Sequence, residues 1–404
     1  MRLPIVLLIA ASLPAAENWL PLFNGVNLDE FEIRSGKAAY KLDNGEIVGT
    51  TVEGSPNTFL CTRKTYGDFL LAFEVKTDPR LNSGVQLRSH AYDKPAEVVT
   101  MNQGARRVTH QPGRVYGYQV EVATEKSGAS GGIYDEARRG WIHNTSNDPG
   151  CKAAFKDNQW NHYYVEARRD RIRTWVNHIP CADVVDSLDL DGFIGLQVHQ
   201  FQGGSPAEVR WRNLRIAELG RHSWKPIFDG KSLNGWNGNG GGEWKITDGA
   251  LHGAQATGST ERGFLISADD YSNFTLRLQY KAVRGNSGVF FRMGEPPWSI
   301  RGSLGYEVEV DPTRDPGGLQ HPGARGWLVH TGPVAETPHV KPTDWNTMTI
   351  SAHGRRIVVH VNGVKMSEVV NDPGPLSGRL ALQLNPRNDL EVFYKDLAIL
   401  SPGK

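Results

Sequence analysis

The sequence NSGVQLR at residues 82–88 returns as NSGVFFR at residues 286–292, and GYQVEV at 117–122 returns as GYEVEV at 305–310. Apolar and polar residues alternate along GYQVEV and GYEVEV. They also alternate along VQLR at residues 85–88. Side chains of a β-strand point alternately to opposite faces, so each segment predicts a strand with one apolar face and one polar face. We therefore expect the same β-domain to occur twice.

The polar residues of these strands indicate where the function lies. Alternation places Gln86 and Arg88 on the polar face of one strand, and Gln119 and Glu121 on the polar face of the other. In an antiparallel sandwich, the apolar face packs on the core and the polar face remains free for chemistry. We expect Arg88 and Glu121 to share one solvent-facing surface.

The repeat extends across nearly the whole chain. Residues 19–25 correspond to 224–230, and paired motifs continue as far as residues 213–214 and 396–397. Each copy contains many short strand patterns separated by Gly, Pro, Asn and Asp, which is typical of an all-β sandwich or jelly roll. The predicted domains are residues 17–220 and 221–404, joined by a short connector.

The first copy is longer than the second between these two strands. The offset between copies falls from 204 at Gly84 and Gly288 to 188 at Gly117 and Gly305, so about 16 extra residues lie within 90–114. Two interpretations stay open. The insertion is either a specificity loop beside the polar face or a tolerated surface insertion.

The first 16 residues have the three parts of a secretory signal peptide. Arg2 supplies a positive start, residues 5–11 are apolar, and Ala15-Ala16 offers a cleavage site. A buried N-terminal strand is the alternative. The apolar run is too short to span a bilayer, so we expect a secreted or periplasmic protein without membrane insertion.

Composition narrows the possible partners. The net charge is +1, with 45 basic and 44 acidic residues, and this balance gives no indication of nucleic acid. Cys61, Cys151 and Cys181 allow one disulfide and one free thiol, with the pairing open. No zinc-binding spacing occurs; no cofactor is predicted, and the sequence leaves a divalent metal and the oligomeric state open.

Six motifs occur in a fixed order in the first copy: FNG at 23–25, NSGV at 82–85, GYQV at 117–120, GGIY at 131–134, WN at 160–161 and GLQVH at 195–199. This ordered set resembles the 3-keto-disaccharide hydrolase domain, also described as a 3-keto-glucoside lyase/hydratase, and the resemblance covers nearly all of both copies. It implies tandem concanavalin A-like jelly rolls in an exported bacterial protein that acts on oxidised sugars.

The second copy departs from the family pattern. It has Leu319-Gln320 where the first copy has Ile133-Tyr134, and Asn385 where the first has His199. We therefore expect the first domain to be catalytic and the second to have a binding or structural role.

The reaction that the resemblance implies requires three chemical functions. A ketone at C3 of a glucoside acidifies the hydrogen on C2, so a base can remove it, the C1 substituent leaves and water adds back. His199 is the candidate proton carrier, Glu121 a base or the group that orients His199, and Arg88 the enolate stabiliser. The ordinary alternatives are a solvated histidine and a surface ion pair between Arg88 and Glu121.

Further polar and aromatic residues are candidates for contacts with a glycoside or oligosaccharide substrate. The aromatic side chains would stack on sugar rings, although aromatic residues are more often part of a core. The candidates are Asn82, Gln86, Gln119, Gln197, Tyr134 and Trp175.

Two other functions compete with this hypothesis. Glu307, Glu309 and Asp311 alternate along one strand, an array that could serve a retaining glycoside hydrolase, although the first copy lacks it. A carbohydrate-binding protein without chemistry is the other alternative, because jelly-roll faces also bind glycans.

Overall fold

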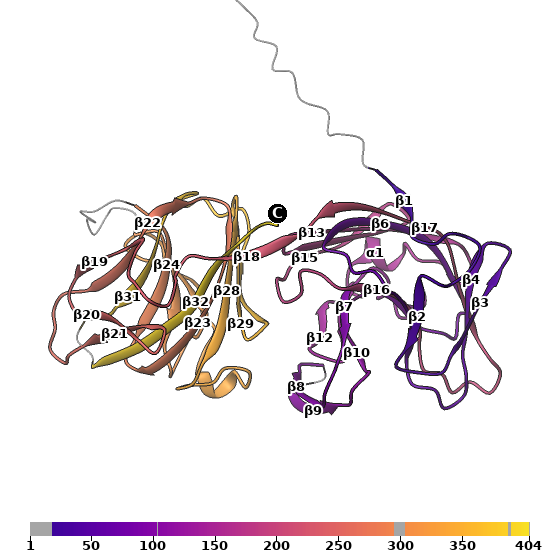
Figure 1. The fold of residues 1–404 in the computed structure, drawn as a ribbon, viewed down its shortest axis with the longest axis horizontal. Coiled ribbons are helices and arrows are strands. Elements are labelled where there is room, and N and C mark those ends of the chain that lie inside the picture. Colours follow the sequence, from indigo (N-terminus) through magenta and orange to yellow (C-terminus); the bar gives the residue numbers. More distant parts are fainter. Residues whose placement is uncertain (1–17, 103, 295–303, 387–388, 404) are drawn as a thin grey trace, which may run out of the picture.

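The computed structural model describes residues 18–102, 104–294, 304–386 and 389–403. Two pairs of antiparallel sheets form two β-sandwiches that lie side by side (Figure 1). The prediction of an all-β chain with two tandem concanavalin A-like sandwiches is confirmed. The predicted signal peptide, residues 1–16, lies outside the described residues.

The first sandwich consists of an eight-stranded and a seven-stranded sheet. The larger sheet has the order β15 (Ile179–Val185), β14 (Arg171–Val176), β13 (Asn161–Arg168), β6 (Asp68–Thr77), β17 (Glu208–Gly220), β4 (Glu46–Thr50) and β3 (Ala39–Asp43), with β1 (Leu20–Pro21) also paired to β17. The smaller sheet has the order β12 (Gly140–His143), β11 (Ile133–Glu136), β10 (Val115–Val122), β7 (Ser83–Ala91), β16 (Phe193–Val198), β5 (Thr58–Thr62) and β2 (Phe31–Arg34).

The second sandwich repeats this arrangement. One sheet has the order β20 (Glu243–Thr247), β21 (Ala250–Gln255), β32 (Leu390–Pro402), β23 (Phe274–Arg284), β28 (Asn346–His353), β29 (Arg356–Val361) and β30 (Val364–Val369), with β18 (His222–Pro226) also paired to β32. The other has the order β19 (Trp236–Gly240), β22 (Gly263–Tyr271), β31 (Gly378–Leu384), β24 (Ser287–Met293), β25 (Tyr306–Val310), β26 (Leu319–His321) and β27 (Gly326–Val329).

Small elements complete the described part of the fold. Strands β8 (Ala96–Thr100) and β9 (Arg106–His110) form a separate hairpin that coincides with the insertion of the first copy. The helical elements are α1 (Pro149–Lys152) and the 3-10 turn η1 (Val334–Glu336). Among the described helices, none has the length and apolar character that crossing a membrane requires.

The apolar alternation seen in the sequence forms the core between the two sheets. Val85, Tyr118, Val120 and Val122 are all buried in one cluster, as predicted. Leu196 of β16 joins them, while the polar residues between these positions point to the other face of the seven-stranded sheet. The register of β7, β10 and β16 therefore determines which polar side chains can meet.

A β-bulge interrupts this alternation at Arg88, and the expectation that Arg88 lies on the solvent-facing surface is wrong. The pairing of β7 shifts register against both β10 and β16 at this point, and Arg88 has a φ of 46°. The extra residue of a bulge re-aims the side chain. Arg88 is 0% exposed and donates to the carbonyl oxygens of Gly67 (2.8 Å) and Arg169 (2.6 Å), and to Asp68 (3.0 Å).

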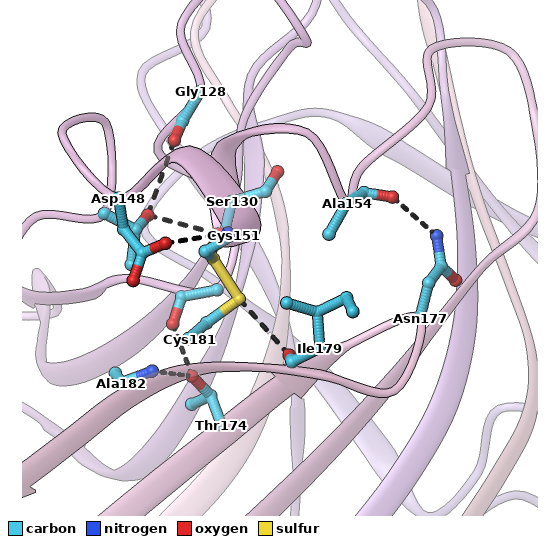
Figure 2. Close-up of a disulfide and its surroundings, with 12 residues drawn as sticks. Gly128, Ser130, Asp148, Cys151, Ala154, Thr174, Asn177, Ile179, Cys181 and Ala182 are labelled. Carbon is cyan, nitrogen blue, oxygen red and sulfur yellow. Dashed lines mark hydrogen bonds between the residues drawn. A yellow bond between two sulfur atoms is a disulfide. The ribbon is translucent and has the colours of Figure 1, made fainter.

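One disulfide fastens α1 to the eight-stranded sheet (Figure 2). It joins Cys151 of α1 to Cys181 of β15, which resolves the pairing that the sequence left open. Asp148 caps α1 by accepting a hydrogen bond from the Cys151 backbone at 3.0 Å. Cys61 is a buried free thiol, and burial raises its pKa.

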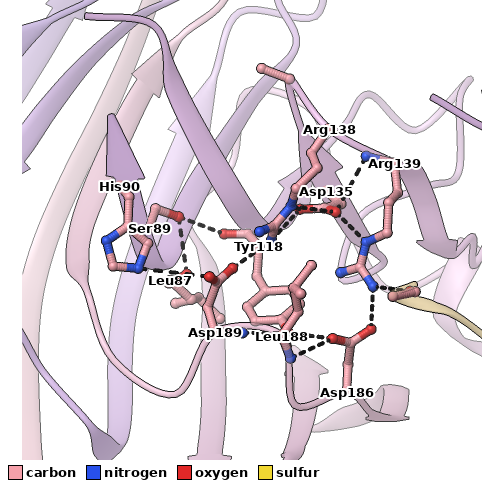
Figure 3. A network of polar contacts seen from close by, with 12 residues as sticks. Leu87, Ser89, His90, Tyr118, Asp135, Arg138, Arg139, Asp186, Leu188 and Asp189 are labelled. Carbon is pink, nitrogen blue, oxygen red and sulfur yellow. Dashed lines mark hydrogen bonds and ion pairs between the residues drawn. The ribbon is translucent and has the colours of Figure 1, made fainter. Parts of the chain in front are cut away.

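Polar side chains of the first sandwich connect the two sandwiches. Arg139 pairs with Asp135 and Asp186 of its own domain (Figure 3), and its Nη1 also donates to the carbonyl oxygen of Gly363 at 2.5 Å. Asp170, also buried, accepts hydrogen bonds from Thr275 (2.6 Å) and Ser351 (2.7 Å) of the second domain. The two sandwiches thus share a hydrogen-bonded junction.

Candidate functional site

A pocket of about 500 Å³ opens on the polar face of the seven-stranded sheet of the first domain. Asn82, Gln119 and Glu121 form its floor, Tyr134 lies to one side, and His199 follows the end of β16. These five residues were all predicted from the sequence. The structure brings them to one site because β7, β10, β11 and β16 are neighbours in the sheet.

Glu121 is the buried carboxyl group of this pocket. Its side chain is 6% exposed, and burial raises its pKa to about 7 in spite of hydrogen bonds from Asn82 and Gln119, which favour the charged form. A carboxyl group with this pKa can either give or take a proton near neutral pH. It is therefore suited to acid–base chemistry.

A chain of hydrogen bonds behind the pocket ends on Glu121. The Ser89 hydroxyl donates to Gln86 Oε1 (2.7 Å), Gln86 Nε2 donates to Gln119 Oε1 (2.7 Å), and Gln119 Nε2 donates to Glu121 Oε2 (3.0 Å). We call Ser89, Gln86 and Gln119 the amide relay. The amide relay holds the carboxyl group of Glu121 in place and provides a hydrogen-bond donor to its Oε2.

Gly84 makes room for the amide relay. A Cβ atom at this position would lie 2.4 Å from Cδ of Gln119, so any side chain there would displace Gln119. This close approach explains why the repeated motif has a glycine beside the polar residues of the neighbouring strand.

One ring nitrogen of His199 is engaged in a hydrogen bond to the backbone. Its Nδ1 lies 2.8 Å from the carbonyl oxygen of Gln200, and because a carbonyl can only accept, Nδ1 carries the hydrogen. In the neutral ring, Nε2 is then the unprotonated nitrogen that can accept a proton. The Gln200 backbone N–H in turn donates to Asn57 Oδ1 (2.9 Å), which anchors the segment that carries the histidine.

Sequence reasoning missed a second carboxylate with its arginine. Glu136 lines the pocket, accepts from Asn57 (3.2 Å) and is paired with Arg114. The other terminal nitrogen of Arg114, Nη1, is buried without a partner. Strand alternation from Tyr134 would have indicated Glu136, because the two residues are two positions apart on β11.

The insertion of the first copy forms one wall of the pocket. Thr100, Asn102, Arg106 and His110, from the β8–β9 hairpin and its turn, line the cavity. Asn102 donates to the Tyr134 hydroxyl at 3.3 Å, which ties the hairpin to the sheet. The location expected for a specificity loop is confirmed, while its effect on specificity stays a prediction.

Other predicted residues lie away from the pocket. Gln86 and Gln197 are buried behind its floor, and neither lines the cavity. Trp175 is on β14 in the other sheet of the sandwich, where it contacts Tyr164 edge-on (ring centroids 5.2 Å apart) and lies under Arg173. The expectation that Trp175 belongs to the same site is wrong, because an alternation pattern does not specify which sheet a strand joins.

The second domain keeps the position of the pocket but not the amide relay. Phe290 and Met293 replace Gln86 and Ser89 and are buried in a small apolar cluster. Glu307 replaces Gln119. Within the described residues, no group of three or more His, Cys, Asp or Glu side chains is arranged to hold a metal ion.

Two antiparallel β-sandwiches, each with a polar pocket on one sheet, define the class of this protein. The chain matches the 3-keto-alpha-glucoside-1,2-lyase-like domain twice, over residues 18–217 and 223–400. It therefore belongs to this family and contains two tandem copies of the domain.

Individual relatives are more distant. A 3-keto-disaccharide hydrolase of Bacteroides thetaiotaomicron is 38% identical over 74 residues, which are 16% of this chain and 26% of that protein. The matched part thus spans about a quarter of the relative's length.

The solved structures that resemble the chain each correspond to about one domain. A provisionally named glycosyl hydrolase of Parabacteroides distasonis is 20% identical, with a TM-score of 0.34 and coverage of 44% of this chain and 92% of that chain. The carbohydrate-binding module CBM66 of Bacillus subtilis is 19% identical, with a TM-score of 0.33 and coverage of 41% and 96%. With TM-scores below 0.5, neither likeness bears on the chemistry.

Proposed function

We propose that the first domain cleaves 3-keto-glycosides by elimination at C1 followed by hydration. The observation that carries this proposal is Glu121, a buried carboxyl group whose pKa is raised to about 7 and which lies in the same pocket as His199. Family membership supplies the substrate class. Two proton-transfer groups are what an elimination next to a ketone requires.

His199 is the base and Glu121 the acid in this mechanism. His199 Nε2 takes the proton from C2, the C1–O bond breaks, and the departing oxygen receives the proton of Glu121. Water then adds across the new C1–C2 double bond: its hydroxyl goes to C1, Glu121 recovers a proton from the water, and His199 returns its proton to C2. The net reaction is hydrolysis, and both groups regain their starting states.

Arg114 takes the role expected of Arg88. The enolate that forms at the C3 oxygen needs a fixed positive charge, and Arg88 is buried away from the pocket. Arg114 lines the pocket, one of its terminal nitrogens bonds Glu136, and the other has no partner. A guanidinium held in this way can donate to an oxyanion without losing its anchor.

The test compares a 3-keto-disaccharide with its unoxidised parent and identifies the products. Elimination requires the ketone, so only the oxidised sugar should be cleaved, and in heavy water deuterium should appear at C2. Equal cleavage of both sugars, without deuterium at C2, would favour an ordinary glycosidase. Arg114→Lys should lower turnover, whereas Arg88→Lys should act mainly on stability.

We also propose that the protein is exported and that the mature chain begins near Glu17. The support is the sequence pattern of residues 1–16 together with a disulfide, which is typical of an oxidising compartment. N-terminal sequencing of the natural protein checks this. A cytosolic protein that retains Met1 would contradict it.

A further inference from the structure

The second domain has its own pocket on the polar face of β24 and β25. The cavity has a volume of about 340 Å³, and Glu307 and Glu309 lie on its floor. Glu309 is fixed by hydrogen bonds from Asn286 and from Gln320 (2.8 Å). Glu307 lies across Gly288, where a Cβ atom would come within 2.5 Å of its Oε1. Neighbouring groups thus hold both carboxyl groups in position on the floor of the pocket.

Gln383 indicates that this pocket is built for a ligand. It lines the cavity from β31 and is 1% exposed. Its side chain hydrogen-bonds Glu307, but its Oε1 has no partner. A buried acceptor left without a partner is unfavourable, so a ligand that donates a hydrogen bond would stabilise it.

The charge balance of the second pocket is opposite to that of the first. Basic side chains dominate the first pocket, where Arg106, Arg114, Arg138, His110 and His199 face Glu121 and Glu136. Acidic side chains dominate the second, where Glu307, Glu309, Asp311 and Asp315 face Arg262 and Arg314. The second pocket therefore suits a ligand that carries positive charge.

The electrostatics of Glu307 and Glu309 favour a positively charged neighbour. Burial raises the pKa of both carboxyl groups, and the charge of Glu309 raises that of Glu307 further. Arg262 opposes the rise at Glu307, while Asp311 and Asp315 add to it at Glu309. A positive charge beside these carboxyl groups would therefore favour their ionised forms.

Trp327 provides a flat apolar surface at the same pocket. It is 36% exposed and stacks against His330, with ring centroids 4.2 Å apart. An exposed tryptophan beside polar side chains is the arrangement that binds the face of a sugar ring.

We propose that the second pocket is a binding site for amino sugars, in which an ammonium group lies between Glu307 and Glu309, a hydroxyl donates to Gln383, and the ring lies on Trp327. A charged amine favours the ionised form of both glutamates, so protons held by these carboxyl groups are released when the ligand binds. Binding at this site is independent of the chemistry in the first domain, because it involves residues of the second domain alone.

Isothermal titration calorimetry of the full chain with glucosamine, near pH 6.5 where an amine is charged, tests the proposal. Glucosamine should bind with a heat that depends on the ionisation enthalpy of the buffer, because a proton is released. Glucose and N-acetylglucosamine have no ammonium group, so their affinity should be lower than that of glucosamine by a factor of roughly ten or more. Equal binding of glucose, no measurable binding of glucosamine, or a heat independent of the buffer would overturn it.

Matched variants locate the site. Glu307→Gln introduces the residue that the first domain already accommodates as Gln119, so it should fold and weaken glucosamine binding roughly tenfold. Trp327→Ala, at an exposed position, should also weaken it. Glu121→Gln, the same exchange in the first pocket, should leave it unchanged. Full binding by Glu307→Gln, or loss in Glu121→Gln, would place the ligand elsewhere.

Discussion

Replacing Glu121 by Gln should separate the chemistry of the first pocket from its stability. The amide keeps the volume of the side chain but cannot donate a proton to a leaving oxygen, so turnover should fall by roughly 10²-fold or more. The amide relay consists of amides and a hydroxyl, so it can reverse the direction of all its hydrogen bonds and accept from the new Nε2. We therefore expect the variant to fold.

The raised pKa of Glu121 predicts how the variant's stability depends on pH. The pKa is 4.5 in the ordinary case and about 7 in the folded protein, so the folded state keeps a proton that the unfolded state loses. Stability of the wild type should fall as pH rises from 4.5 to 7, by about 3 kcal/mol at 1.36 kcal/mol per pH unit. Glu121→Gln lacks this loss, so its stability relative to wild type should increase over the same interval.

Urea denaturation at pH 4.5, 6 and 8 measures this difference. Glu30→Gln, a change at an exposed carboxylate, is the matched control and should follow the wild type at every pH. If Glu121→Gln also follows the wild type, the carboxyl group is not held protonated by burial. If its turnover is unchanged as well, Glu121 is not the acid.

His199→Gln should melt like the wild type but lose turnover by roughly 10²-fold or more, and unchanged initial rates on a 3-keto-glucoside would remove His199 from the mechanism. Tyr134→Ala should raise KM, whereas Trp175→Ala should leave KM unchanged, because Tyr134 lines the pocket and Trp175 does not. Steady-state kinetics of both variants measure this. A raised KM in Trp175→Ala alone would reverse the assignment. The double change Cys151→Ser with Cys181→Ser should lower the unfolding free energy by about 3–4 kcal/mol, the usual value for a loop of this length, and unchanged urea midpoints would refute a structural role for the disulfide.

The fold could be predicted because two kinds of local signal agreed. Alternation correctly predicted that Tyr118, Val120 and Val122 of β10 point into the core, and the repeated motifs predicted two copies. Gln119 and Glu121 lie on the opposite face, but they are buried there and not in solvent as expected. These signals depend only on neighbouring residues and on comparison within the chain, so no knowledge of tertiary structure was needed.

The site could be predicted only in part, because two of its determinants are not local. The bulge at Arg88 changes which face of the sheet its side chain occupies, and the alternation of residues 82–88 does not predict this bulge. Trp175 satisfies alternation but lies in the opposite sheet. Arg114, at the end of the insertion, and Glu136, on β11, are brought together only by the tertiary fold.

The junction between the sandwiches has a consequence for how the chain unfolds. Proteins with two domains commonly lose them one at a time. Here, unfolding of the second domain would remove the hydrogen-bond donors to Asp170 and the carbonyl oxygen that Arg139 binds. The first domain would then be less stable. Each half therefore contributes to the stability of the other, even though the second copy has Asn385 where the first has His199.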